Sequence, residues 1–240
     1  MRSHQYFLIL GSAIVTAVAL YLWLSISHTN NPSKAYWLWA GITENLAPKN
    51  SDLYIYQGFI QNAQNPPSHR HGGLYAYPIS CNKCYLVYRL DPSLPDAKQV
   101  VTVFLNDAKK WEKHQVTIRG LQIDYDSPTN QLVLYGSFLS ELRNYLPSKY
   151  ELDITGLGDW ITAGNIRSLK AIAASTEDIV FQLYDGRHPL KYTSYYIRAL
   201  KRYPFPFRLG VLQTHPLSHE LRQLKNNPNF HGIIYFIQKG

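Results

Sequence analysis

Two carboxylates, Asp124 and Asp126, stand two residues apart in the otherwise apolar run "GLQIDYDSPT", which ends in a turn signal. Side chains two apart on a strand point to the same face, so both acids share a polar face with Gln122, and the alternate residues are apolar. A pair of carboxylates that flanks a bond is the usual apparatus for cleaving a glycosidic linkage. The spacing therefore indicates acid–base chemistry, with a sugar as the first substrate to consider.

Alternatively, the two acids could have a purely structural role. Buried carboxylates are costly unless a partner compensates their charge. Arg89, in "YRLD", lies at the end of the preceding predicted strand, where it could form an ion pair with Asp124. From the sequence alone, the acids are either part of a functional site or part of an ion pair that closes one end of the fold.

Eight apolar runs of strand length follow one another along the chain, and helix-like segments separate most of them. The runs lie at 35–40, 52–60, 84–91, 118–126, 150–157, 178–185, 207–215 and 231–238. Segments with helical spacing of apolar residues lie at 95–114, 129–146, 165–175, 194–203 and 218–226. Repeated strand–helix alternation is typical of parallel βαβ units, so residues 35–240 are predicted to form an α/β fold, a (β/α)8 barrel of the TIM type.

We expect this barrel to be incomplete. Residues 61–80 form a long loop where the second helix would stand, and no helical segment follows the last run, so the final helix is expected to be missing. An open α/β sheet is the alternative fold.

In a (β/α)8 barrel, the active site lies at the C-terminal ends of the strands, where both acids are expected. Trp160 follows the fifth strand and could stack on a sugar ring, while Gln213 and His215 alternate inward after "GVL". His215 could be a second acid–base group or, together with the two aspartates, a metal ligand. A purely structural role is the alternative for each. Other strand ends present Gln57, Asp91 and Asp159.

The stretches "GLQIDYDSPT" and "LDITGLGDWI" resemble the signature stretches of a bacterial family known as domain of unknown function 3142. The resemblance runs from about Tyr36 to Ile237. It implies a barrel fold and brings no established activity with it.

A more distant likeness is to the family eighteen glycoside hydrolases, the chitinase type, which carry Asp-x-x-Asp-x-Asp-x-Glu on strand four and Met-x-Tyr-Asp on strand six. Asp124 falls on the third Asp and Asp126 on the catalytic Glu, and "QLYD" places Tyr184 and Asp185 on the second motif. The departures from the two motifs are Arg119, Gln122 and Gln182, which replace the first Asp, the second Asp and the Met.

This likeness implies roles for the matching residues. Asp126 would be the general acid towards the leaving oxygen, and Asp124 would orient a substrate acetamido group that acts as internal nucleophile. Tyr184 would donate a hydrogen bond. The residues expected to contact the sugar around them are Arg89, Gln122, Trp160, Asp185, Gln213 and His215.

The N-terminal segment predicts a membrane anchor. From Tyr6 to Ser27 the chain carries no charge, over about the length that a bilayer-spanning helix needs. Arg2 precedes this segment and Lys34 is the first basic residue after it, so the positive-inside rule exports the rest of the chain. A signal cleaved near Ser27 is the alternative. We expect a cytoplasmic stub (1–6), a single-pass signal anchor in a bacterial inner membrane (7–27), a linker (28–34) and a domain in the periplasm or outside the cell (35–240).

The two cysteines, Cys81 and Cys84 in "SCNKCY", form a single Cys-x-x-Cys pair. A zinc site would need a second pair, and a redox motif would need a thioredoxin-like context. In an exported domain a local disulfide is expected, with unpaired thiols and redox or metal work as the alternatives.

Composition narrows the function further. A hydrophobic content of 45% and a charged content of 17% are typical of a globular protein. The net charge of +8 permits attraction to anionic surfaces, but no nucleic-acid-binding motif accompanies it, so nucleic acid is not an expected partner. No cofactor is expected.

Three functional hypotheses remain. The first is an envelope-anchored glycoside hydrolase-like barrel that acts on or binds a cell-envelope or extracellular polysaccharide. The second is a non-catalytic carbohydrate-binding or envelope-assembly protein. The third is a metal-dependent hydrolase that uses Asp124, Asp126 and His215.

Overall fold

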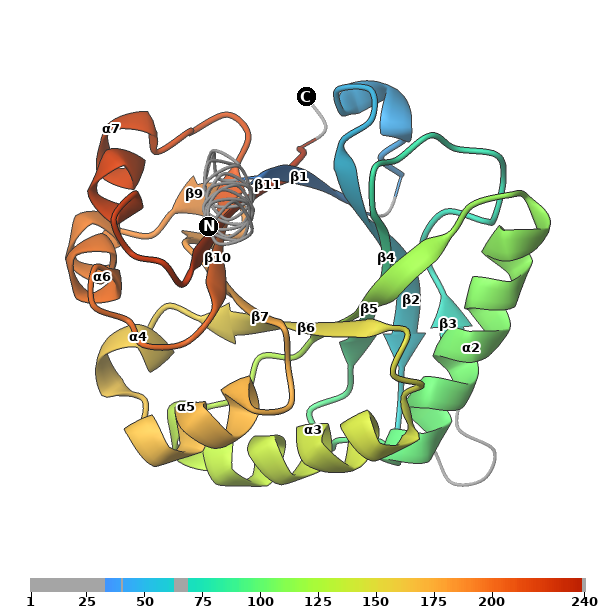
Figure 1. The fold of residues 1–240 in the computed structure, drawn as a ribbon, viewed down its shortest axis with the longest axis horizontal. Helices are drawn as coiled ribbons and strands as arrows, with labels where there is room; N and C mark the ends of the chain where they lie inside the picture. Colours follow the sequence, from blue (N-terminus) through green and yellow to red (C-terminus); the bar gives the residue numbers. More distant parts are fainter. Residues whose placement is uncertain (1–32, 40, 63–68, 239–240) are drawn as a thin grey trace, which may run out of the picture. The chain divides into compact units, whose positions relative to one another are not determined.

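Eight parallel strands form a closed barrel in the computed structural model (Figure 1). In order around the barrel they are β1 (Ser33–Leu38), β2 (Asp52–Ile60), β4 (Cys84–Leu90), β5 (Ile118–Asp124), β6 (Glu151–Leu157), β7 (Asp178–Gln182), β10 (Phe207–Leu212) and β11 (Phe230–Phe236). Strand β1 pairs in parallel with both β11 and β2, which closes the sheet on itself. The predicted TIM-type barrel and its eight strands are confirmed, and the open-sheet alternative is wrong.

The structure describes residues 33–39, 41–62 and 69–238, so the predicted membrane span at 7–27 lies outside it. Among the described residues, no helix combines the length and the apolar character needed to cross a membrane. The N-terminal anchor stays a prediction.

Helices surround the barrel on its outer side (Figure 1). They are α2 (Ala97–Lys113), α3 (Leu132–Tyr145), α4 (Trp160–Ala163), α5 (Ile166–Ala173), α6 (Thr193–Leu200) and α7 (Ser218–Leu221), with the 3-10 turns η1 (Glu44–Leu46), η2 (Thr129–Gln131) and η3 (Arg222–Leu224). Helix α2 shows why these segments are helical. The carboxylate of Asp96 accepts a 2.9 Å hydrogen bond from the backbone N–H of Gln99, which caps the helix. Val100, Phe104 and Trp111 are buried towards the strands.

The layer of helices is thinner at the beginning and end of the chain. Between β2 and β4, the described residues contain no helix but a short strand, β3 (His69–His71), which pairs antiparallel with the end of β2. Among the described residues between β1 and β2, η1 is the only helical element, and no helix follows β11 within the residues described up to 238. The two barrel positions expected to lack a helix therefore show none in the described part of the chain.

The barrel has two hydrophobic cores because side chains alternate along each strand. In β5, Leu121 and Ile123 pack outward in the large core between strands and helices. Gln122 points inward, where its Oε1 accepts a 2.6 Å hydrogen bond from Nε1 of Trp37. The inner core consists of Ala35, Trp37, Tyr54, Tyr85, Val87, Val180 and Ile234. Asp124 follows Gln122 on the same inward face, as the sequence pattern predicted.

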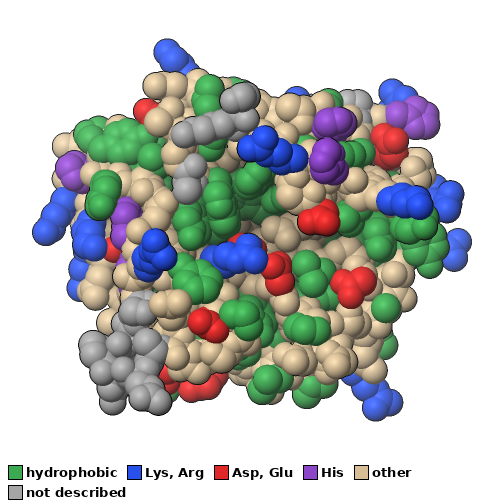
Figure 2. Space-filling view, turned by 180° about the vertical axis from the view of Figure 1, so that it is seen from behind, with side chains coloured by type: hydrophobic (Ala, Val, Ile, Leu, Met, Phe, Trp, Pro, Cys, Tyr) green, Lys and Arg blue, Asp and Glu red, His purple; other side chains and the backbone are tan. Residues whose placement is uncertain are grey.

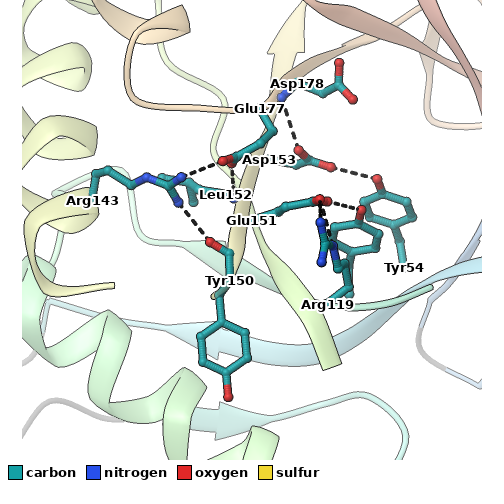
Figure 3. Close-up of polar contacts among 10 residues, drawn as sticks. Tyr54, Arg119, Arg143, Tyr150, Glu151, Leu152, Asp153, Glu177 and Asp178 are labelled. Carbon is teal, nitrogen blue, oxygen red and sulfur yellow. Dashed lines mark hydrogen bonds and ion pairs between the residues drawn. The ribbon is translucent and has the colours of Figure 1, made fainter. Parts of the chain in front are cut away.

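A buried polar network crosses the barrel near the start of β6 and β7 (Figure 3). The carboxylate of Asp153 accepts hydrogen bonds from the hydroxyl of Tyr54 at 2.7 Å and from the backbone N–H of Asp178 at 3.1 Å. Nε of Arg208 donates to Asp178 at 2.8 Å. Burial, reinforced by the charge of Asp178, raises the pKa of Asp153. Residues at this end of a TIM barrel serve stability, so we assign this network to the scaffold.

Candidate active site at the C-terminal end of the barrel

A pocket of about 590 Å³ opens where the strands end, on the side of the barrel that carries active sites in TIM folds. Its lining combines four carboxylates with a single guanidinium and several aromatic rings. The charged residues are Arg89, Asp124, Asp126, Asp159 and Asp185, and the aromatic ones are Trp37, Trp39, Tyr184, Tyr196 and Phe236. Figure 2 shows a face of the molecule on which hydrophobic side chains border a central hollow, with acidic and Lys or Arg side chains beside it.

Arg89 joins the two acids that the sequence pattern singled out. Strands β4 and β5 bring Arg89 and Asp124 into register, with Nη1 of Arg89 3.2 Å from Oδ2 of Asp124. Nη2 lies 2.5 Å from Oδ2 of Asp126. The side chain of Asp124 is 2% exposed and that of Asp126 is 45% exposed. The Arg89–Asp124 ion pair that the structural alternative required is therefore present, and it extends to a second carboxylate that faces the pocket.

Asp124 is held in place from the neighbouring strand as well. The hydroxyl of Thr155 on β6 donates a 2.9 Å hydrogen bond to Oδ1 of Asp124. Burial raises the pKa of Asp124 to about 6, although Arg89 and the Thr155 hydrogen bond oppose this effect. A carboxyl group with such a pKa can take up or release a proton near neutral pH, which is a common property of functional acids.

Aromatic rings form the floor and one wall of the pocket. The indole of Trp37 is buried beneath it, where the hydrogen bond to Gln122 fixes its orientation. Tyr184 contacts Trp37 edge-on, with ring centroids 6.4 Å apart, and stacks on Phe236 at 5.2 Å. The indole of Trp39 lies 6.1 Å from Phe236. Partly exposed rings beside carboxylates offer both apolar faces and hydrogen-bond acceptors to a ligand.

The structure brings some of the predicted site residues together and leaves others apart. Five of them line the pocket, namely Arg89, Asp124, Asp126, Tyr184 and Asp185. Asp159, one of the other strand-end residues, lines it too. Gln57 and Asp91 instead bond to Trp111 and Ser93.

Four predicted sugar contacts do not reach the pocket lining. Gln122 lies below the floor, bonded to Trp37. Trp160 has no exposed surface with which to stack on a sugar, and its Nε1 donates a 2.9 Å hydrogen bond to the backbone oxygen of Ser127. Gln213 and His215 are exposed in the turn after β10.

The described residues do not form the metal site predicted from Asp124, Asp126 and His215. Among the described residues, no three His, Cys, Asp or Glu side chains lie close enough to share a metal ion. His215 is not in the lining that holds Asp124 and Asp126. The described residues therefore do not provide the metal site that a metal-dependent hydrolase would need.

Thr155 and Phe236 are site residues that the sequence analysis missed. In "LDITGL", Thr155 follows Asp153 at a spacing of two, on the inward face of its strand. In "HGIIYFIQ", Phe236 follows the inward-facing Ile234 at the same spacing. Alternation along β6 and β11 was the signal that could have found both.

The cysteines lie away from the pocket, at the start of β4. Cys81 and Cys84 form a disulfide, with their Cα atoms 5.9 Å apart. Cys84 is fully buried as the first residue of the strand, so the bond ties the end of the 61–80 segment to the barrel.

Two solved structures are similar to this chain, and the first of them supports the barrel fold. The xylanase–α-amylase inhibitor protein XAIP-I, solved in complex with trehalose, has a TM-score of 0.57 at 13% sequence identity, over 86% of this chain and 93% of that chain. The spore cortex-lytic enzyme SleL of Bacillus cereus has a TM-score of 0.44 at 18% identity, over 75% of this chain and 50% of that chain. At such identities, the likeness to XAIP-I concerns the fold alone.

Sequence comparison gives the family. No curated protein matches this chain significantly. The family described as a domain of unknown function, DUF3142, matches residues 83–203, from β4 to the end of the α6 region, and so includes Arg89, both acids and Tyr184. The chain is a member of the DUF3142 family, in agreement with the resemblance of the stretches "GLQIDYDSPT" on β5 and "LDITGLGDWI" on β6.

Proposed function

We propose that this barrel binds a glycan in the pocket at the C-terminal ends of its strands. One observation carries the proposal: the Asp124–Arg89–Asp126 cluster lies in the same 590 Å³ pocket as the partly exposed rings of Trp39 and Tyr184. Carboxylates and a guanidinium can bond the hydroxyl groups of a sugar, while aromatic rings pack against its apolar ring face. XAIP-I, which shares the fold, was solved with trehalose, and this supports a sugar as the ligand class.

We further propose that the glycan is a polysaccharide of the cell envelope or of the cell exterior. The basis is the charge-free N-terminal segment between Arg2 and Lys34. Such a segment would anchor the chain in a bacterial inner membrane and carry the barrel into the periplasm or beyond it.

Hydrolysis of the glycan is a second proposal, and the pKa of Asp124 favours it. Burial gives this carboxyl a pKa of about 6, so a proton is available beside Asp126 near neutral pH. In this reaction Asp126 donates a proton to the leaving oxygen as the glycosidic C–O bond breaks. An acetamido oxygen of the substrate attacks the anomeric carbon, Asp124 orients that group, and Tyr184 donates a hydrogen bond. Water then attacks the same carbon, displaces the acetamido oxygen and returns a proton to Asp126, which completes the hydrolysis. Arg89 has to release Asp126 for this step, whereas binding without turnover needs no such release.

A glycan panel tests both proposals. Full-length protein is titrated with chito-, cello- and xylo-oligosaccharides, trehalose and peptidoglycan fragments, and products are followed by mass spectrometry. At least one sugar class is expected to bind, and Arg89→Met and Asp126→Asn should weaken that binding at least tenfold. Glu141→Gln, an exposed acid on α3 outside the pocket, is the control. Absence of binding across the panel would contradict the first proposal, and binding without products would contradict the second.

A further inference from the structure

A second cavity, of about 300 Å³, lies beside the pocket, and we call it the side cavity. Two side chains, Arg89 and Asp126, line both the pocket and the side cavity. The remaining residues of the side cavity are Phe59, Leu90, Pro92, Tyr125, Pro128 and Gln131. The 2.5 Å ion pair between Arg89 and Asp126 therefore forms the wall that separates the two spaces.

Strand register explains why the two spaces adjoin. Phe59 on β2 is in register with Arg89 on β4, and Arg89 is in register with Asp124 on β5. Leu90 and Tyr125 pack in the large core between strands and helices, whereas Arg89 and Asp124 face the pocket. The wall is accessible from solvent, because the side chains of Arg89 and Asp126 are 44% and 45% exposed.

The chemistry of the side cavity differs from that of the pocket. Apart from the Arg89–Asp126 pair, its lining is uncharged. The hydroxyl of Tyr125 donates a 2.9 Å hydrogen bond to the backbone oxygen of Pro92, which holds that side of the cavity together. The side-chain amide of Gln131 is exposed and has no hydrogen-bond partner among the described residues, so it can bond a ligand. Apolar surface with one available amide suits a neutral sugar ring.

We propose that the side cavity is a second sugar subsite, and that a glycan chain crosses the Arg89–Asp126 ion pair with one part in each space. This inference rests on the proposed glycan binding in the pocket. It specifies the ligand as an oligosaccharide or an internal stretch of a polymer whose neutral residue occupies the side cavity. The linkage between the two parts lies over Asp126, next to the carboxyl group of Asp124.

Chain length is the property that tests this proposal. Full-length protein is titrated with chito-, cello- and xylo-oligosaccharides of two and of six residues. The hexasaccharide of at least one series should bind at least tenfold more tightly than its disaccharide, because a disaccharide can lie entirely within the 590 Å³ pocket, whereas the longer chain fills both spaces. Gln131→Trp fills the side cavity and should remove this difference, while the Kd of the disaccharide stays within twofold of the wild-type value. Gln131→Ala, which removes only the amide, should reduce the difference.

Asn130→Trp is the matched control, since Asn130 is the exposed neighbour of Gln131 and lines neither space. It should keep the tenfold difference. Equal binding of disaccharide and hexasaccharide, or a hexasaccharide advantage that survives Gln131→Trp, would overturn the second subsite and leave the proposed function standing. Failure of both lengths in every series would instead contradict the proposed function itself.

Discussion

Arg89 and Asp124 face each other across β4 and β5, with the guanidinium nitrogen 3.2 Å from a carboxylate that is 2% exposed. The two residues depend on each other to different degrees, because Arg89 is 44% exposed and also contacts Asp126, whereas Asp124 is buried. Removal of Asp124 leaves Arg89 with a partner and with solvent, whereas removal of Arg89 leaves Asp124 buried without its cation. Stability and function can therefore be measured separately at this cluster.

The Asp126→Asn variant is expected to keep the fold and lose function. Both partners of the Arg89–Asp126 pair are nearly half exposed, so its loss should cost at most about 1 kcal/mol of unfolding free energy. Glycan binding should fall at least tenfold, and if the protein turns a glycan over, kcat should fall by about 10²–10⁴. Thermal unfolding and titration with the sugar found in the panel check both effects. Early unfolding together with wild-type sugar binding in Asp124→Asn and Asp126→Asn would show that the pair is structural.

Deprotonation of Asp124 should lower the free energy of unfolding as the pH rises. Its folded-state pKa of about 6 is above the ordinary value of 3.8, so the folded state holds this proton more tightly than the unfolded state. The contribution of Asp124 to the free energy of unfolding is fully present below about pH 4 and is lost as the pH rises through about 6. The loss reaches about 3 kcal/mol above pH 7.

Asp124→Asn removes that titration, so the difference in unfolding free energy between variant and wild type should grow in favour of the variant from pH 4 to pH 7. Urea unfolding at several pH values measures it. A difference that stays constant across this range would contradict the raised pKa.

Gly210→Ala should disturb the floor of the pocket. A Cβ at Gly210 would lie 2.6 Å from the Trp37 ring, which cannot move away easily because it is buried and bonded to Gln122. We expect a loss of about 1–3 kcal/mol of stability from overpacking, together with weaker sugar binding. Gly136→Ala on α3 is the control, since its Cβ would meet Ile172 at an ordinary 3.5 Å. It should leave stability unchanged or raise it slightly. Equal unfolding midpoints for the two variants would contradict the steric argument.

The disulfide should be intact and modestly stabilising. Thiol alkylation of the native protein should label neither Cys81 nor Cys84 until a reductant is added. The bond closes a loop of only four residues, for which the chain-entropy relation gives about 2 kcal/mol. Comparison of the unfolding free energy of oxidised and reduced protein measures this value. Labelling without reductant would show that the thiols are unpaired.

The anchor prediction concerns residues 7–27, outside the described part of the chain. Full-length protein should sediment with membranes and resist extraction with alkaline carbonate, because a charge-free span of this length partitions into the bilayer. A soluble mature form that begins near Ser27 would instead identify a cleaved signal.

The sequence predicted the barrel and the acid cluster because both depend on alternation within strands. Each of the eight strands places apolar residues in the large core, and Gln122 and Asp124 occupy the opposite face of β5. The pattern does not determine side-chain directions beyond the end of a strand. β10 ends at Leu212, so alternation no longer determines where Gln213 and His215 point. Trp160 begins α4, and the direction of a helix after a strand depends on packing against Tyr135 and other distant residues.

The closure of the barrel through β1 also has a consequence for how the chain folds. Tyr36 pairs with Tyr235, a separation of 199 residues (235 − 36), and their rings stack at 5.4 Å. Contacts so distant in sequence form late and slow the folding of the whole domain. During synthesis, β1 emerges first and exposes one unpaired edge until β11 arrives between it and β10. An unpaired edge can recruit strands from other molecules, so this barrel is most prone to aggregation in the interval before its last strand is inserted.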